Sequence, residues 1–140
     1  MSNTFVSERT IPFPREKVFQ AWTNPELLAT WWGPAGFTNT FEKCDITPGG
    51  DWIFTMIGPD GVKYPNISRW LEIVYNYVAL EHVNDPHFFM KADFEDIGNA
   101  TEIMWTMLFD TPEILAGLKP IITPANEQNL DRLEACLRKM

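Results

Sequence analysis

Two histidines with turn-forming residues between them offer the first candidate chemistry in this chain. His82 and His87 flank Asn84-Asp85-Pro86, and neighbouring imidazoles can act as acid and base or bind a metal ion. The intervening sequence is typical of a turn, which places both histidines at the rim of a hairpin. We therefore expect solvated or capping histidines, with a role in a site as the alternative. Two histidines and one aspartate without a further ligand are a weak metal signal, so no metal site is predicted.

Glu72 is the third titratable candidate, and it lies in the apolar segment Trp70–Val74. Alternate side chains of a strand share a face, so Glu72 is predicted to lie on the same face as Trp70. If that face is the inner one, burial would raise the pKa of the carboxyl group, which could serve as an acid, a base or a polar anchor. Pairing with Arg69 or Arg132, or simple exposure, is the structural alternative.

Known catalytic signatures are absent from the sequence, which has no G-x-S-x-G, no Walker loop and no H-E-x-x-H. Gly49-Gly50 lacks the helix-opening context of a dinucleotide-binding loop. Cys44 and Cys136 lie far apart and lack the spacing of metal ligands, so we interpret them as buried or inert thiols. Whether the protein is an enzyme stays undecided at this stage, and no cofactor is predicted.

Large aromatic and sulfur-containing side chains are the strongest sign of a binding site. The chain has six Trp, ten Phe and six Met. Any one of them is best explained as core, but together they suit the lining of a pocket for a flat or flexible apolar ligand. Glu72, His82 and Asn126 are expected to orient that ligand. The side chains predicted to contact it are Trp31, Trp32, Trp52, Phe54, Met56, Trp70, Glu72, His82, Met90, Trp105, Met107, Asn126 and Leu130.

The elements that must position these side chains begin with a strand and two short helices. Residues Thr4–Ile11 alternate as a strand does, and the prolines that follow end it. A first helix is predicted to begin at Pro14. Asn24 can cap a second helix, which Gly33-Pro34 ends.

A run of about six strands is predicted from Phe37 to Asp110, because the side chains alternate with period two between turn-forming residues. Strands that follow one another in this way form an antiparallel meander, and a final helix makes the fold class α+β. The inner face of the sheet is expected to carry large aromatic side chains and flexible Met side chains.

The end of the chain predicts a helix that packs on the sheet. Thr123-Pro124 is interpreted as an N-cap followed by a first-turn proline. An apolar stripe then follows at helical spacing, comprising Asn126, Leu130, Leu133 and Leu137. Residues 112–118 are expected to form a separate helical turn or two, because Pro120 and Pro124 should interrupt a continuous helix.

Length and charge limit the classes of function. A chain of 140 residues is expected to form one domain, residues 1–140. Its net charge of −8 repels phosphate backbones and anionic membrane surfaces, so nucleic acid and membrane are not expected as partners. The sequence has no signal-like start and no apolar run of membrane-spanning length. We therefore expect a soluble, cytoplasmic protein.

Several segments spread over almost the whole chain form a recognisable set. They are Ala21–Pro34, Pro48–Trp52, Met56–Gly61, Glu72–Val74, Phe94–Asp96 and Asn126–Leu133. Together they resemble the activator of heat-shock-protein-90 ATPase homologue-like proteins of the SRPBCC/START superfamily, which includes the Bet v allergen-like proteins. The resemblance implies a helix-grip fold. In that fold a curved seven-stranded antiparallel sheet wraps around a long C-terminal helix, two short helices join strands one and two, and a cavity separates sheet from helix.

The resemblance implies several functions, because the members of this family include chaperone activators, carriers of hydrophobic ligands and polyketide aromatase/cyclases. The first hypothesis is a protein that binds a small hydrophobic or aromatic molecule in the cavity. One alternative is an aromatase/cyclase- or hydrolase-type enzyme that uses the same pocket. Another is a chaperone-interacting protein. A chaperone contact and a homodimer are left open as partnerships.

Overall fold

The computed structural model describes residues 2–140 of the chain. Its helices and strands follow the predicted order, with a strand, two short helices, six further strands and a final helix. The elements are β1 (Thr4–Ile11), α1 (Arg15–Thr23), α2 (Pro25–Trp31), β2 (Thr38–Cys44), β3 (Asp51–Ile57), β4 (Lys63–Val74), β5 (Tyr77–His82), β6 (Phe88–Asp96), β7 (Thr101–Phe109) and α3 (Pro112–Lys139). Within residues 2–140, no helix is long and apolar enough to cross a membrane.

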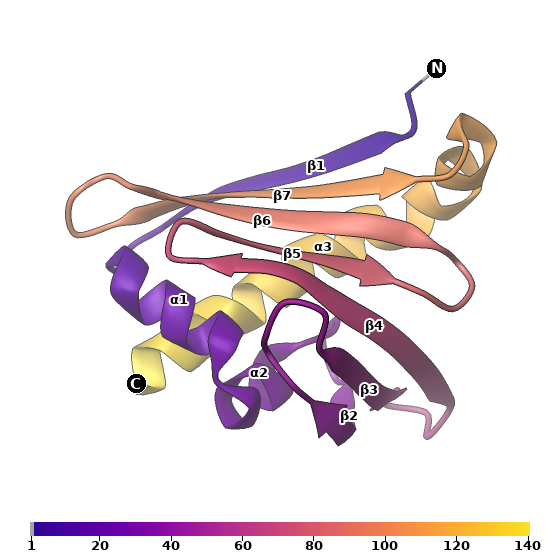
Figure 1. Ribbon diagram of the computed structural model, residues 1–140, viewed down its shortest axis with the longest axis horizontal. Coiled ribbons are helices and arrows are strands. Elements are labelled where there is room, and N and C mark those ends of the chain that lie inside the picture. Colours follow the sequence, from indigo (N-terminus) through magenta and orange to yellow (C-terminus); the bar gives the residue numbers. More distant parts are fainter. Residues whose placement is uncertain (1) are drawn as a thin grey trace.

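All seven strands form one antiparallel sheet in the order β1-β7-β6-β5-β4-β3-β2. α3 lies along one face of this curved sheet, and α1 and α2 lie beside the C-terminal half of α3 (Figure 1). Strand alternation explains which face is covered: in β7, Ile103, Trp105, Met107 and Phe109 are buried while the residues between them are more exposed. The predicted α+β helix-grip fold is confirmed.

The two short helices form where their start signals predict. The Asn24 side chain accepts a hydrogen bond from the backbone N–H of Glu26 at 3.0 Å, and Pro25 occupies the first helical position. The indole N–H of Trp31 donates to the carbonyl of Ala21 at 3.0 Å, which fixes α2 against α1.

The prediction of a break before the last helix is wrong. α3 begins at Pro112, and Thr111 caps it by accepting a hydrogen bond from the N–H of Ile114 at 3.2 Å. Thr123 lies inside this helix, where its hydroxyl donates to the carbonyl of Lys119 at 2.7 Å. Pro120 and Pro124 are exposed, so the carbonyls that lose a donor lie on the solvent side. The long buried stripe of α3 on the sheet keeps the helix continuous across both prolines.

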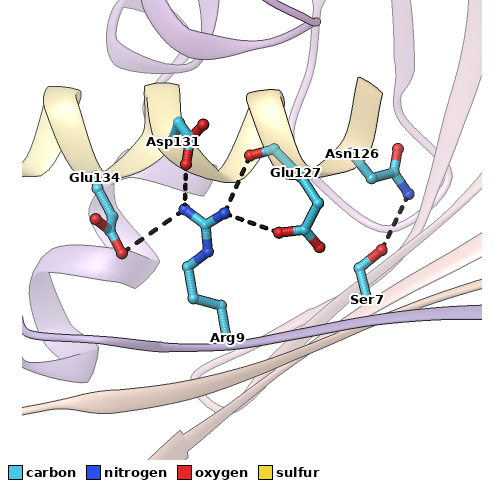
Figure 2. Close-up of polar contacts among 6 residues, drawn as sticks. All are labelled: Ser7, Arg9, Asn126, Glu127, Asp131 and Glu134. Carbon is cyan, nitrogen blue, oxygen red and sulfur yellow. Dashed lines mark hydrogen bonds and ion pairs between the residues drawn. The ribbon is translucent and has the colours of Figure 1, made fainter. Parts of the chain in front are cut away.

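An arginine on the first strand ties the sheet to α3. Figure 2 shows the Arg9 guanidinium among three carboxylates of α3. It donates to Glu127 at 2.9 Å and to Asp131 at 2.7 Å, and it lies 3.8 Å from Glu134. This cluster holds the edge strand β1 against the helix that covers the sheet.

Candidate functional site

A cavity of about 250 Å³ lies between the inner face of the sheet and α3. Strands β3 to β7, the segment after α2 and the middle of α3 all contribute to its wall. Nine of the thirteen side chains predicted to contact a ligand line this cavity. They are Trp32, Trp52, Phe54, Met56, His82, Met90, Trp105, Met107 and Asn126.

A rigid cluster of aromatic rings forms one side of the cavity. The Trp52 ring stacks on Phe54, with 4.2 Å between ring centroids. Trp32 meets Trp52 edge-on at 5.1 Å and contacts Trp105 at 5.6 Å. Such offset and edge-on pairs hold the rings in place and leave flat apolar surfaces for a ligand.

Three of the predicted residues lie in the core behind this wall. Trp70 is fully buried and stacks on Trp52, with 5.2 Å between ring centroids, but it does not line the cavity. Trp31 packs edge-on against Trp22 at 4.8 Å. Leu130 is fully buried within the core cluster. The periodicity of the sequence predicts which face of each strand is buried, but it does not show which of the buried residues line the cavity.

Glu72 is the fourth predicted residue outside the cavity. The prediction that it shares a face with Trp70 is wrong, and the alternative of simple exposure holds. β4 and β5 pair Trp70 with Leu80 and then Glu72 with Ala79, so Leu71 is an extra residue at a register shift. The extra residue reverses the alternation, and Glu72 lies exposed on the outer face. There its carboxylate accepts a hydrogen bond from the Tyr77 hydroxyl, which raises the pKa of Tyr77. It pairs with neither of the arginines considered as alternatives.

The structure places the two histidines on opposite sides of the sheet. His82 is buried at the cavity, and its Nδ1 lies 2.7 Å from the carbonyl oxygen of Pro86, to which it donates. Its Nε2 lies 2.7 Å from Oδ1 of Asn66. Burial lowers the pKa of His82. Both ring nitrogens are thus engaged by protein groups, and the Pro86 contact matches the predicted capping role.

His87 points away from the cavity and lies between two carboxylates. Nε2 is 2.7 Å from Glu81, and Nδ1 is 2.7 Å from Asp110. Hydrogen bonds to Glu81 and Asp110 raise the pKa of His87. Among residues 2–140, no group of three or more His, Cys, Asp or Glu side chains has the arrangement of a metal site. Through its contacts with Glu81 and Asp110, His87 links β5 to the residue that follows β7.

Sequence reasoning missed three polar residues in the cavity wall: Asn66, Ser68 and Asn129. The signal for the first two was available, because Asn66, Ser68 and Trp70 alternate on one face of β4. Asn129 follows Asn126 by three positions and therefore shares its helix face.

An arginine on α3 holds the segment that forms the rim of the cavity. Trp32, Gly33 and Pro34 line the cavity just after α2. The guanidinium of Arg132 donates to the carbonyls of all three at 3.0 Å, and also to those of Thr30 and Phe37 at 3.1 and 2.9 Å. Burial lowers the pKa of Arg132.

Gly33 shows how closely this rim is packed. Its φ angle is +99°, and a Cβ atom would lie 2.8 Å from the terminal methyl carbon of Met56. The flexible Met56 side chain could move aside, so it is the backbone conformation that favours glycine here.

The cavity opens into a larger hollow at the surface, of about 560 Å³. The two share Pro34, Met56, Asn66, His82 and Pro86. The outer hollow is also bordered by side chains of the loop after α2, of β4 and of α3, including Phe37, Tyr64 and Ile121, of which Ile121 is 65% exposed. A ligand therefore has a route from the surface to the inner cavity, with Lys63 and Asp85 among the residues that line its outer part.

Comparison with known proteins gives one family and many solved structures. The family model "Activator of Hsp90 ATPase homolog 1-like protein" matches residues 12–138. No curated protein matches the chain at a significant level. Similar solved structures include a protein from Nitrosomonas europaea, with 19% identity, a TM-score of 0.88 and coverage of 97% of this chain and 94% of that one.

Two further structures extend this similarity. A protein from Arthrobacter aurescens has 20% identity and a TM-score of 0.90 over 99% of this chain and 88% of that one. An AHSA1-like protein from Aeromonas hydrophila has 18% identity and a TM-score of 0.77 over 94% and 92%. At these identities the similarity shows the fold.

Proposed function

The chain belongs to the Activator of Hsp90 ATPase homolog 1-like protein family, and from that premise we propose that it binds a small hydrophobic or aromatic molecule in the cavity between the sheet and α3. The observation that carries the proposal is the cavity itself. Eight of its nineteen lining residues are Trp, Phe or Met, and it opens into the outer hollow. Ligand sites are typically apolar concavities with a few polar groups, and an inner volume near 250 Å³ suits a compact ligand.

Native mass spectrometry of the purified protein tests this proposal, followed by identification of any molecule that it retains. Ala125→Phe should abolish retention, because Ala125 lies in the cavity wall and a phenyl ring there would occupy the ligand's space. Ala116→Phe is the matched control, because Ala116 is exposed on the same helix outside this cavity. Equal retention by both variants would contradict the proposal.

An aromatase/cyclase- or hydrolase-type reaction in the same cavity stays an alternative because His82 borders it. Glu72 is no longer a candidate acid or base, since it is exposed on the outer face. His82 would have to exchange a contact with Pro86 or Asn66 to act on a substrate. Turnover of an identified ligand that survives His82→Gln would remove this alternative.

The family's name supports a further alternative, a contact with a chaperone. Such a contact would use the outer surface and would therefore be independent of the cavity. Ala125→Phe should then leave the stimulation of a chaperone ATPase unchanged. No stimulation by the wild-type protein would count against this role. A homodimer and a cytoplasmic location likewise stay predictions.

A further inference from the structure

The cavity wall carries no formal charge in the part of the chain that the structure describes. None of its lining residues is Asp, Glu, Lys or Arg. The one titratable side chain is His82, whose pKa is lowered by burial and whose two ring nitrogens both face oxygen atoms of the protein. An ionised ligand would lose its hydration here without gaining a countercharge, which is costly. The wall therefore favours an uncharged ligand.

Most polar groups of the wall are already bonded to the protein. Asn66 donates to the carbonyl of Tyr64 at 2.9 Å, and its oxygen faces His82 at 2.7 Å. Asn129 donates to the carbonyl of Trp31 at 2.8 Å. Asn66 is thus engaged through both its NH2 group and its oxygen, and Asn129 through its NH2 group.

Asn126 differs from them because its amide is buried but poorly bonded. The residue is 7% exposed and lines the cavity from α3. Its Nδ2 has two partners, the Ser7 hydroxyl (Figure 2) and the Met107 sulfur, both at 3.4 Å. The first distance is long for a hydrogen bond, and a thioether is a weak acceptor. Within residues 2–140, the Asn126 oxygen accepts no hydrogen bond.

Buried amides normally use their donors and acceptors, because an unsatisfied polar group costs free energy in a low-dielectric site. We propose that Asn126 is the recognition residue for a ligand that is uncharged, has a compact ring body and carries one hydrogen-bonding group such as a hydroxyl or carbonyl. This inference rests on the proposed function and names the chemical class of the ligand. The aromatic wall receives the ring, and the amide of Asn126 receives the polar group.

Three matched probes test the ring body, the hydrogen-bonding group and the lack of charge separately: naphthalene, 2-naphthol and 2-naphthoate. Each is titrated into the protein at neutral pH, and binding is followed through the indole N–H signals in NMR spectra. Three indoles line the cavity, those of Trp32, Trp52 and Trp105. In the wild-type protein, 2-naphthol should bind roughly fivefold more tightly than naphthalene through the added hydrogen bond. The carboxylate of 2-naphthoate should make it bind at least about tenfold more weakly than 2-naphthol.

Asn126→Leu keeps the branching and the number of side-chain heavy atoms and removes the amide. In this variant 2-naphthol should lose its advantage, while naphthalene should bind as well as before, which shows that the cavity is intact. Ser68→Ala removes a second side chain of the wall that makes no hydrogen bond within residues 2–140, a buried hydroxyl on β4, and should keep the preference. The indole N–H groups of Trp52 and Trp105 are also buried without a partner, and both variants leave them in place. Loss of the preference in Ser68→Ala instead of Asn126→Leu would overturn the assignment.

Failure of the inference and failure of the proposed function give different results. Equal binding of naphthalene and 2-naphthol by the wild type, or tight binding of 2-naphthoate, would overturn the inference alone. No binding by any probe, together with no retained molecule in native mass spectrometry, would overturn both.

Discussion

At the scale of single residues, Arg132 has the most concentrated set of contacts in the site. Its guanidinium supplies donors to carbonyl groups at the C-terminal end of α2 and along the segment that follows. The Trp32 carbonyl has a second donor, the Asn39 side chain at 2.8 Å. Because helix C-termini carry partial negative charge, a cation there is also electrostatically favourable. One side chain thus orders the rim of the cavity.

Arg132→Ala should lower the free energy of unfolding by about 2–3 kcal/mol, because several charge-assisted hydrogen bonds are lost together. Arg132→Lys should retain only part of the free energy of unfolding that Arg132→Ala loses, since an ammonium group cannot match the planar array of donors of a guanidinium group. Urea denaturation measures both. The control is Arg138→Ala, whose one ion pair is long, at 3.9 Å, and exposed. Equal losses at the two positions would contradict the role given to Arg132.

His87 predicts a pH dependence of stability. Its pKa is raised in the folded protein by Glu81 and Asp110. The stabilisation is therefore fully present below the unfolded-state pKa of about 6.5 and is lost as the pH rises through the raised folded-state value. His87→Gln should cost roughly 0.5–1 kcal/mol near pH 6, because the group is partly exposed, and less near pH 9.

Urea denaturation of wild type and His87→Gln at the two pH values checks this prediction. A cost that is the same at both values would mean that the charge of His87 contributes nothing. The control is Glu81→Gln, which removes one carboxylate partner of His87 and should reduce the pH dependence without abolishing it.

At the scale of elements, α3 shows that tertiary packing can override a local break signal. Pro124 has no N–H for the carbonyl of Pro120, yet the helix continues. Pro124→Ala should restore that hydrogen bond and raise the free energy of unfolding by about 1–2 kcal/mol, after the loss of proline's rigidity in the unfolded chain is subtracted.

Thermal or urea denaturation measures this effect, with Pro112→Ala as the control. Pro112 lies in the first turn of the same helix, where no intrahelical donor is missing, so its replacement should change stability by no more than about 0.5 kcal/mol or reduce it slightly. A loss of stability in Pro124→Ala would mean that the proline contributes packing.

At the scale of the whole molecule, we expect that filling the cavity with a larger side chain raises stability and weakens binding. Ser68 is 2% exposed, lies on the inner face of β4 and lines the cavity. Ser68→Val adds apolar volume and a β-branched side chain suited to a strand. It should raise the free energy of unfolding by about 1 kcal/mol while weakening the binding of aromatic probes. Denaturation and titration of the same variant check both parts.

The Ser68→Ala variant is the control for Ser68→Val. It distinguishes the effect of filling the cavity from the effect of losing the hydroxyl, because alanine removes the hydroxyl without filling the cavity. If valine and alanine had the same effect on probe binding, the filling argument would fail. A destabilised valine variant would indicate that the wall cannot accept the added methyl group.

Much of the site could be predicted from the sequence, because strand alternation is a local property. Once Trp52, Phe54 and Met56 are assigned to one face of a strand, their shared side follows from backbone geometry. The same reasoning failed at Glu72. A single extra residue at Leu71 reverses the alternation, and it is defined only by the pairing of β4 with β5.

The sequence by itself determined the family resemblance, the order of elements, the bounds of β1 and the aromatic character of the inner face. Helix start signals and strand alternation depend only on residues that are close together in the chain. The tertiary structure decided the continuity of α3, the separation of His82 from His87, and the convergence of Arg132 on the segment after α2. Each of these depends on contacts between residues distant in the chain. Whether a buried side chain lines the cavity or supports it from behind is decided in the same way, by the packing of one element against another.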